Sequence, residues 1–402
     1  MSEPPPEEII PTSTIAAPGT ADVDSPSASA VTLVIWLPPE FDPAAETPAS
    51  QLFQARLEEF SARRPQVRIE TRVKEIDGPG GIADTLQTAS AAAPLALPDL
   101  VALPYPALQD AAIKGLIHAF DGLTTVMDDP DWYEYARQLS YIQDNIYGIP
   151  FAGDALISVY RPASIEDGPV DWASTLEVTH PISFPAADQD ALITLTFYQA
   201  AGGNIVDDDG RPTLDLLPLT DVLTFYNQGS VNGVFPFWLT SYETDLQAWD
   251  AFQDQGAQMS ITWASRYLQA LPPDSMAARV PTPDGEAFTT AAGWSWALAS
   301  PDPERQALSA ELAEFLSIGE YASDWAAAAG YLPLRPSGLS AWENTPLSGL
   351  LEQVCTSAVL MPSTDIIAAL GPVLQSSTLE SIKEQSDPAE IGQAALDALA
   401  GP

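Results

Sequence analysis

The chain has 402 residues, 46% of them hydrophobic, which is more than one ordinary core needs and predicts two domains. Its 55 acidic residues outnumber the 15 basic ones, and the formal charge of -40 repels phosphate backbones and anionic lipid surfaces. Nucleic acid and membrane surfaces are therefore excluded as expected partners. Two histidines and one cysteine argue against a zinc site, and Cys355, in a mostly apolar stretch, is expected to be a small buried hydrophobe.

Residues 1–30 are rich in Pro, Ser, Thr, Ala and Glu and show no apolar period, so an extended tether is expected. The sequence contains neither a signal peptide nor an apolar run of about eighteen residues. A tether of this kind suits a stalk between an anchor and a first strand. We therefore expect a removed leader and an extracytoplasmic protein, either lipid-anchored through a cysteine that Met1 replaces or periplasmic.

From Val31 the pattern alternates between strands and helices. The apolar run Val31–Leu37 predicts a parallel strand buried on both faces. Ser50 is expected to cap a helix whose apolar residues recur at helical spacing and which ends before Pro65. The alternation continues with a strand at Val67–Val73, a helix at Gly81–Ala91 and a strand at Leu100–Leu103.

In the second half, two short strand-like runs flank Gly153 and Asp154, and Ala291–Ala299 predicts a strand that leads into a helix at Asp302–Ser317. The segment Asp207–Gly210 predicts a turn, because a calcium loop aligned on its glycine would place an isoleucine at the first ligand position. Further helices are expected at Leu219–Gln228, Thr244–Gln253 and Pro388–Leu399. This order predicts an α/β fold of doubly wound sheets, which bind ligands at the carboxyl ends of their strands.

Six stretches, in this order, carry a resemblance to a known family. They are LEEFSARRPQVRIE (57–70), DNIYGIPFAGDALISVYR (144–161), AGGNIVDDDGRPTLD (201–215), WDAFQDQGAQMSITW (249–263), VPTPDGEAFTTAAGWSWALAS (280–300) and WAAAAGYLPLRP (325–336). Together they resemble family 1 of the extracellular solute-binding proteins, the group that includes maltose-binding protein. The resemblance covers nearly all of residues 31–402.

The resemblance implies two α/β lobes of the periplasmic-binding-protein type II kind, joined by a multi-strand hinge with the ligand cleft between them. Lobe one would comprise residues 31–154 plus 293–325, and lobe two residues 155–292 plus 326–402. The chain would cross between lobes near 151–158, 291–297 and 328–334. A monomeric receptor of this kind closes on a small solute, here expected to be a mono- or oligosaccharide, and delivers it to the permease of an ABC transporter without cofactor, metal or catalytic residue.

Seven side chains are expected to bind the ligand, because they lie at expected strand ends or crossings. They are Trp36, Tyr105, Asp154, Trp263, Trp294, Tyr331 and Arg335. Aromatic rings stack on sugar rings and carboxylates hold hydroxyls. Each candidate also has a structural interpretation: the aromatic rings can be core, Tyr105 a rigid turn between prolines, Asp154 a hinge carboxylate bonded to backbone amides, and Arg335 the partner of a surface acid.

Two other classes of function stay open at the sequence level. A glycoside hydrolase needs only two carboxylates about 5 to 10 Å apart, and 55 acidic residues leave that chemistry available. A receptor for a polyamine, metal chelate or short peptide would also suit so acidic a surface. The sequence GWSWA (293–297) lacks the second glycine of a nucleophile elbow, and both histidines precede it, which excludes a hydrolase triad of that order.

Overall fold

The computed structural model describes Met1, residues 31–76 and residues 78–401. Nine strands form one sheet with the order β2-β1-β3-β10-β6-β8-β7, to which β11 adds by pairing with β10 and β9 by pairing with β6. The strands of this sheet are β1 (Val31–Leu37), β2 (Val67–Val73), β3 (Leu100–Pro104), β6 (Ile149–Tyr160), β7 (Ile182–Ser183), β8 (Met259–Trp263), β9 (Met276–Ala278), β10 (Thr289–Leu298) and β11 (Ala358–Leu360). A separate hairpin pairs β4 (Tyr141–Ile142) with β5 (Asn145–Ile146).

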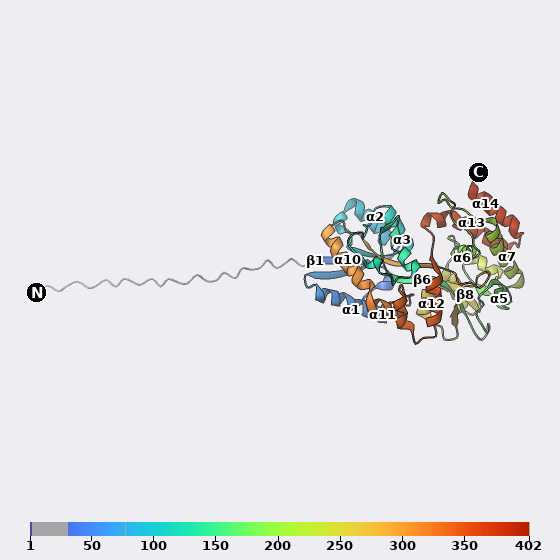
Figure 1. Ribbon diagram of the computed structural model, residues 1–402, viewed down its shortest axis with the longest axis horizontal. Coiled ribbons are helices and arrows are strands. Elements are labelled where there is room, and N and C mark those ends of the chain that lie inside the picture. Colours follow the sequence, from blue (N-terminus) through green and yellow to red (C-terminus); the bar gives the residue numbers. More distant parts are fainter. Residues whose placement is uncertain (2–30, 77, 402) are drawn as a thin grey trace.

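The helices gather into two groups, which Figure 1 shows as two bodies side by side. Around β1 lie α1 (Pro48–Arg63), α2 (Ile82–Ala92), α3 (Tyr105–Ile113), α10 (Pro303–Ser317) and α11 (Gly319–Ala329), which we call the first lobe. Around β8 lie α5 (Trp172–Leu176), α6 (Leu192–Ala200), α7 (Leu216–Asn232), α8 (Asp245–Gln253), α9 (Ala264–Ala270), α13 (Thr364–Lys383) and α14 (Pro388–Ala400), the second lobe. The remaining α-helices are α4 (Glu134–Gln138) and α12 (Ser348–Ser357).

Short 3-10 helices complete the chain at η1 (Pro39–Phe41), η2 (Pro94–Ala96), η3 (Val126–Asp128), η4 (Phe237–Ser241) and η5 (Pro336–Trp342). Within the described ranges, none of the helices combines the length and apolar character that crossing a bilayer needs. The predicted tether at 1–30 lies outside the described residues except for Met1.

Strand β6 joins the two halves of the sheet. Its first part, Ile149–Ala155, pairs antiparallel with β10, and its second part, Leu156–Tyr160, pairs with β8 and β9. The two short runs expected around Gly153 and Asp154 are thus one continuous strand of twelve residues. Neighbouring strands pair with the backbone on both sides, so a glycine and an acidic residue do not interrupt it.

Side chains on the two faces of β1 enter different cores. Leu33, Ile35 and Leu37 pack with Phe53 and other residues of α1, whereas Trp36 packs with residues of α2 and α3 on the opposite face. Both faces are apolar because helices cover both, which is the doubly wound arrangement that the run predicts. A further core holds the second lobe, and another, which contains the buried Cys355, lies between the two.

The first helix begins earlier than its sequence indicates. Thr47, not Ser50, is the N-cap: the Thr47 hydroxyl accepts from the Ser50 amide at 3.1 Å, and the Ser50 hydroxyl accepts from the Thr47 amide at 3.0 Å. This reciprocal capping box places Pro48 at the first helical position, where its missing N–H costs nothing.

Candidate functional site

An open pocket of about 160 Å³ lies where β3, β6, β8 and β10 come together. Its walls come from both lobes, since Tyr105 begins α3 in the first and Trp263 ends β8 in the second. The lining residues are Pro104, Tyr105, Pro106, Asp154, Trp263, Ser265, Arg266, Ala292, Gly293 and Trp294. Four of the seven predicted residues are therefore in one place: Tyr105, Asp154, Trp263 and Trp294.

Asp154 is held by three hydrogen bonds. Its Oδ1 accepts from the backbone amides of Ala155 at 2.9 Å and Ser265 at 3.0 Å, and its Oδ2 accepts from the Ser265 hydroxyl at 2.5 Å. Burial raises the pKa of the Asp154 carboxyl to about 7; the hydrogen bonds from Ser265 and Ala155 oppose that rise, and the charge of Asp245 adds to it. Since Oδ2 has one protein donor, it keeps capacity for another.

The two tryptophans reach the pocket from different strands. Trp294 lies on β10 opposite Ala152 of β6, and the edge-to-face contact of its ring with Phe41 has a centroid separation of 4.9 Å. Trp263 is the last residue of β8 and the N-cap of α9, so its side chain leaves the sheet at a strand end. Both rings are partly buried, which leaves part of each to line the pocket.

Arg266 is a pocket residue that sequence reasoning missed. Its Nε donates to Asp245 Oδ2, and Asp245 Oδ1 accepts from the Thr262 hydroxyl at 2.7 Å, so the guanidinium is held from one side. The remaining nitrogens of this fork lie on the side away from that contact. Its position two residues after the end of β8, in the first turn of α9, is a signal that the sequence did contain.

Tyr105 contributes to two cavities at once. Its side chain is 7% exposed and lines the pocket together with Pro104 and Pro106. It also lines an open cavity of about 440 Å³ on its other side, with residues that include Glu134 and Met361. The Tyr105 hydroxyl accepts a hydrogen bond from Gln109 Nε2 at 2.9 Å.

Trp36 and Tyr331 do not line the pocket. Trp36 is 2% exposed and packs in the core beneath α2 and α3, with Lys74 Nζ 4.9 Å from its ring centroid. The expectation for Trp36 was wrong because a residue within a strand covered on both faces is core; only the residues after the strand can reach the edge. Tyr331 is 7% exposed, and its ring lies parallel to that of Trp325 at a centroid separation of 6.2 Å.

Tyr331 nevertheless lies behind the pocket. Burial raises its pKa above the usual value, and the nearby charges of Asp154 and Glu40 act in the same direction, while hydrogen bonding with Gln269 and Trp294 opposes them. Tyr331 is thus a buried neighbour of the pocket residues and has no surface in the pocket itself.

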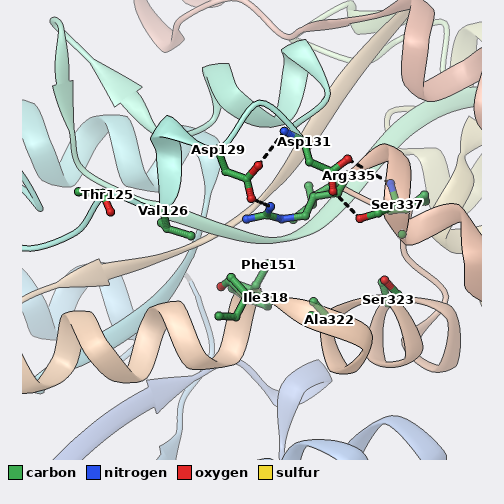
Figure 2. A pocket seen from close by; sticks show the side chains of 16 residues that line it. Thr125, Val126, Asp129, Asp131, Phe151, Ile318, Ala322, Ser323, Arg335 and Ser337 are labelled. Atoms are coloured by element: carbon green, nitrogen blue, oxygen red, sulfur yellow. Dashed lines mark hydrogen bonds and ion pairs between the residues drawn. The ribbon is translucent and has the colours of Figure 1, made fainter.

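Arg335 belongs to a different cavity, of about 470 Å³, that shares no lining residue with the pocket around Asp154. Figure 2 shows it with Asp129 and Asp131 on one side and Ile318, Ala322 and Ser323 on the other. Arg335 Nη1 donates to Asp129 Oδ2 at 2.6 Å, and its guanidinium carbon lies 3.8 Å from the ring centroid of Trp132. Pairing with a surface acid, the structural interpretation of Arg335, therefore describes its position.

Solved structures with similar folds are all of low sequence identity. The maltose-bound MalE3 of T. maritima is 17% identical with a TM-score of 0.71, covering 92% of this chain and 99% of that one. The sugar-binding protein MalE of Xanthomonas citri is 17% identical (TM-score 0.73, 92% and 98% covered), and the cyclic alpha-maltosyl-1,6-maltose binding protein of Arthrobacter globiformis is 16% identical (TM-score 0.74, 92% and 98%). These similarities confirm the fold class, two α/β lobes of the type II kind.

The sequence comparisons add the family. Comparison with curated proteins gives no match. Residues 55–346, more than half of the chain, match the family described as bacterial extracellular solute-binding protein. Members of this family bind solutes and are not enzymes, so a glycoside hydrolase is set aside. From its sequence over these residues and from its fold, the chain belongs to the bacterial extracellular solute-binding proteins.

Proposed function

We propose that this protein is an extracytoplasmic receptor that binds a carbohydrate in the pocket around Asp154 and closes its lobes on it. The observation that carries the proposal is the convergence of two indole rings, Trp263 and Trp294, with a carboxylate and a guanidinium, Asp154 and Arg266, in one pocket. Flat rings stack on the apolar faces of pyranoses, and an acceptor beside a forked donor matches neighbouring hydroxyls.

The size of the pocket supports a closing motion. Its volume of about 160 Å³ is below the range of about 300 to 1,000 Å³ usual for small-molecule sites. A sugar of one or more rings therefore requires the lobes to move apart before they close around it. Strands β6 and β10 connect the lobes beside the pocket, so rotation about them changes its width directly.

A cationic solute is the second candidate, because several acidic groups lie near the pocket. Asp188 has a pKa raised by burial and by the charges of Asp190 and Asp245, and Asp245 acts in the same direction on Asp154. A bound cation would relieve this repulsion. A polyamine or a short basic peptide would supply such a charge.

Calorimetric titration with a panel of ligands tests the proposal. Maltose and maltotetraose represent sugars, spermidine a polyamine and a basic tripeptide the peptides. We expect one-to-one binding of a sugar with micromolar or lower Kd and recovery of the unchanged sugar by chromatography after long incubation. Binding of spermidine or the peptide with no sugar bound would replace the carbohydrate proposal, and release of cleaved sugar would contradict the receptor.

The finer biological setting is also a proposal. We propose that the protein works as a monomer, delivers its solute to the permease of an ABC transporter, and is held at the outer face of the cell membrane by a lipid on its native N-terminus. The family and the fold support a receptor of this kind. Fractionation of native cells with a radiolabelled fatty acid tests the anchor: label absent from the purified native protein would contradict it.

A further inference from the structure

The side chain of Gln109 forms hydrogen bonds to elements of both lobes. Gln109 lies on α3 and is 7% exposed. Its Nε2 donates to the hydroxyl of Tyr105, which lines the pocket, at 2.9 Å. Its Oε1 accepts from the backbone amide of Thr364 at 3.1 Å and from the Thr364 hydroxyl at 3.3 Å. One amide group thus connects a pocket residue to the first residue of α13, 255 positions away in the sequence.

The contact at Thr364 replaces a missing helix cap. The first amides of a helix have no partner within the helix and usually bond to the side chain of the N-cap residue. In α13 the N-cap is Ser363, whose side chain makes no cap bond and donates to Asp365 instead. The Gln109 carbonyl takes that role from the other lobe. Helix α13 otherwise packs on α7 and α14 of the second lobe, so its N-terminus is the part that reaches the first.

The position of this contact links it to the pocket. Pro104 and Pro106, on either side of Tyr105, line both the pocket around Asp154 and a cavity of about 700 Å³ that also includes Thr364. A shift of Tyr105 away from Gln109, or of α13 away from α3, leaves part of a buried amide without a partner. Such a group is costly, so each displacement makes the other easier.

We propose that Gln109 is a positioning residue, which fixes the Tyr105 ring at the pocket and couples its position to the contact of α13 with α3. Its effect on solute affinity rests on the proposed function, whereas its effect on the arrangement of the lobes does not. The ligand-free protein can therefore test the proposal without knowledge of the solute.

Thr364→Pro is a clean variant for this purpose. Proline removes both donors to Gln109, the amide and the hydroxyl, yet it is favoured at the first position of a helix. The preceding residue, Ser363, already has the extended conformation that proline requires of it, with φ -61° and ψ 154°. Thr364→Ser keeps both donors and is the matched control. Gln109→Met removes the same contacts from the other side with little change in shape.

The first measurement is the distance between the lobes in the full-length, ligand-free protein. Spin labels on cysteines replacing the exposed Thr88 of α2 and Glu390 of α14 report it by pulsed dipolar spectroscopy, because the native Cys355 is buried. We expect Thr364→Pro and Gln109→Met to broaden the distance distribution and lengthen its mean, and Thr364→Ser to leave it as in the unsubstituted protein. An unchanged distribution in both disrupting variants would overturn the proposal.

The second measurement uses maltotetraose as the probe and a double-mutant cycle. In the natural background, Thr364→Pro should weaken binding by about 5-fold to 30-fold, as expected for one or two lost buried hydrogen bonds. In a Tyr105→Phe background, which lacks the hydroxyl that Gln109 holds, Thr364→Pro should change Kd by less than about 2-fold. Equal effects in both backgrounds would overturn the coupling. Failure of the unsubstituted protein to bind maltotetraose would count against the sugar proposal, and the distance measurement alone would then decide the role of Gln109.

Discussion

Trp294 touches both the pocket and the core, and the two roles can be separated by its neighbour on the same strand. Trp294 and Trp296 are two positions apart on β10 and therefore point to the same face of the sheet. Trp296 is 2% exposed and its ring stacks with Phe151 at a centroid separation of 4.2 Å, outside the pocket. Trp296 is thus a matched control for Trp294.

We expect Trp294→Ala to weaken sugar binding by about 2 to 4 kcal/mol, or about 30-fold to 1000-fold in Kd, because it removes a stacking face. Trp296→Ala should instead lower the free energy of unfolding by about 3 to 5 kcal/mol, with Kd unchanged below the transition. Calorimetry paired with thermal unfolding of both variants makes the test. Loss of affinity in Trp296→Ala equal to that in Trp294→Ala would show that neither effect is local.

The raised pKa of Asp154 predicts how stability depends on pH. A carboxyl whose pKa is about 7 in the folded protein, against about 3.9 unfolded, binds its proton more tightly in the folded state. Its contribution to stability is therefore present below about pH 4 and is lost as pH rises toward about 7. Other carboxylates also titrate, so the observable is the difference between the natural protein and Asp154→Asn.

We expect the Tm of the natural protein, relative to that of Asp154→Asn, to fall between pH 5 and pH 7 and to level off above about pH 8. The same substitution should weaken sugar binding at pH 8, where the natural carboxylate is charged, more than at pH 5. A Tm difference independent of pH would mean that the Asp154 carboxyl titrates in its ordinary range. Unchanged affinity would mean that it serves the hinge alone.

At the scale of elements, β6 depends on a glycine where the lobes meet. A Cβ on Gly153 would lie 2.3 Å from the Tyr135 hydroxyl and 3.2 Å from the Leu332 carbonyl oxygen. The Tyr135 hydroxyl cannot simply move, because it donates to the Pro333 carbonyl at 3.0 Å. The third crossing of the chain therefore packs directly on the backbone of β6, as the isolated bridge between Gly153 and Leu332 also indicates.

Gly153→Ala should lower the free energy of unfolding by roughly 1 to 3 kcal/mol, the usual cost of overpacking a core. Tyr135→Phe removes the nearest clashing atom and should recover part of that loss when the two are combined. Gly349→Ala is the control, since its Cβ would meet nothing within 4 Å on α12. Urea unfolding at constant m makes the comparison. Purely additive effects of Gly153→Ala and Tyr135→Phe would contradict the proposed contact.

The sequence predicts most elements but fewer of the side-chain environments. Apolar runs such as Val31–Leu37 and helices with clear caps are where they were expected, because local pattern alone determines them. The start at Thr47 was missed since two hydroxyl residues competed for one cap. Trp36 and Arg266 were misjudged or missed because pattern gives the end of a strand but not which neighbour occupies the space beyond it.

At the scale of the whole molecule, charge is the dominant feature. The formal charge of -40 on 402 residues implies repulsion among surface carboxylates, which a compact chain brings closer together. The described residues contain few ion pairs to offset it, among them Arg305 with Asp99 and Arg161 with Asp274. The predicted division into 31–154 plus 293–325 and 155–292 plus 326–402 stays a prediction, and both halves would share this excess.

We expect the Tm to rise with NaCl between 0.05 and 1 M, because screening shortens the range of repulsion from about 10 Å at 0.1 M to about 3 Å at 1 M. Differential scanning calorimetry at pH 7 and at pH 4.5 makes the test, since protonation of carboxylates at the lower pH should reduce the dependence on salt. A Tm that falls with NaCl at pH 7, or that rises equally at both pH values, would contradict this origin.

The strand that belongs to both halves of the sheet also limits how this protein can be recombined. Strand β6 contributes its first residues to pairing with β10 and its last to pairing with β8, so no single cut releases two intact modules. An exchange of one lobe with a distant homologue would have to swap several separate stretches and match the register of a common strand. New solute specificity is therefore more readily acquired by point changes around the pocket than by shuffling of lobes.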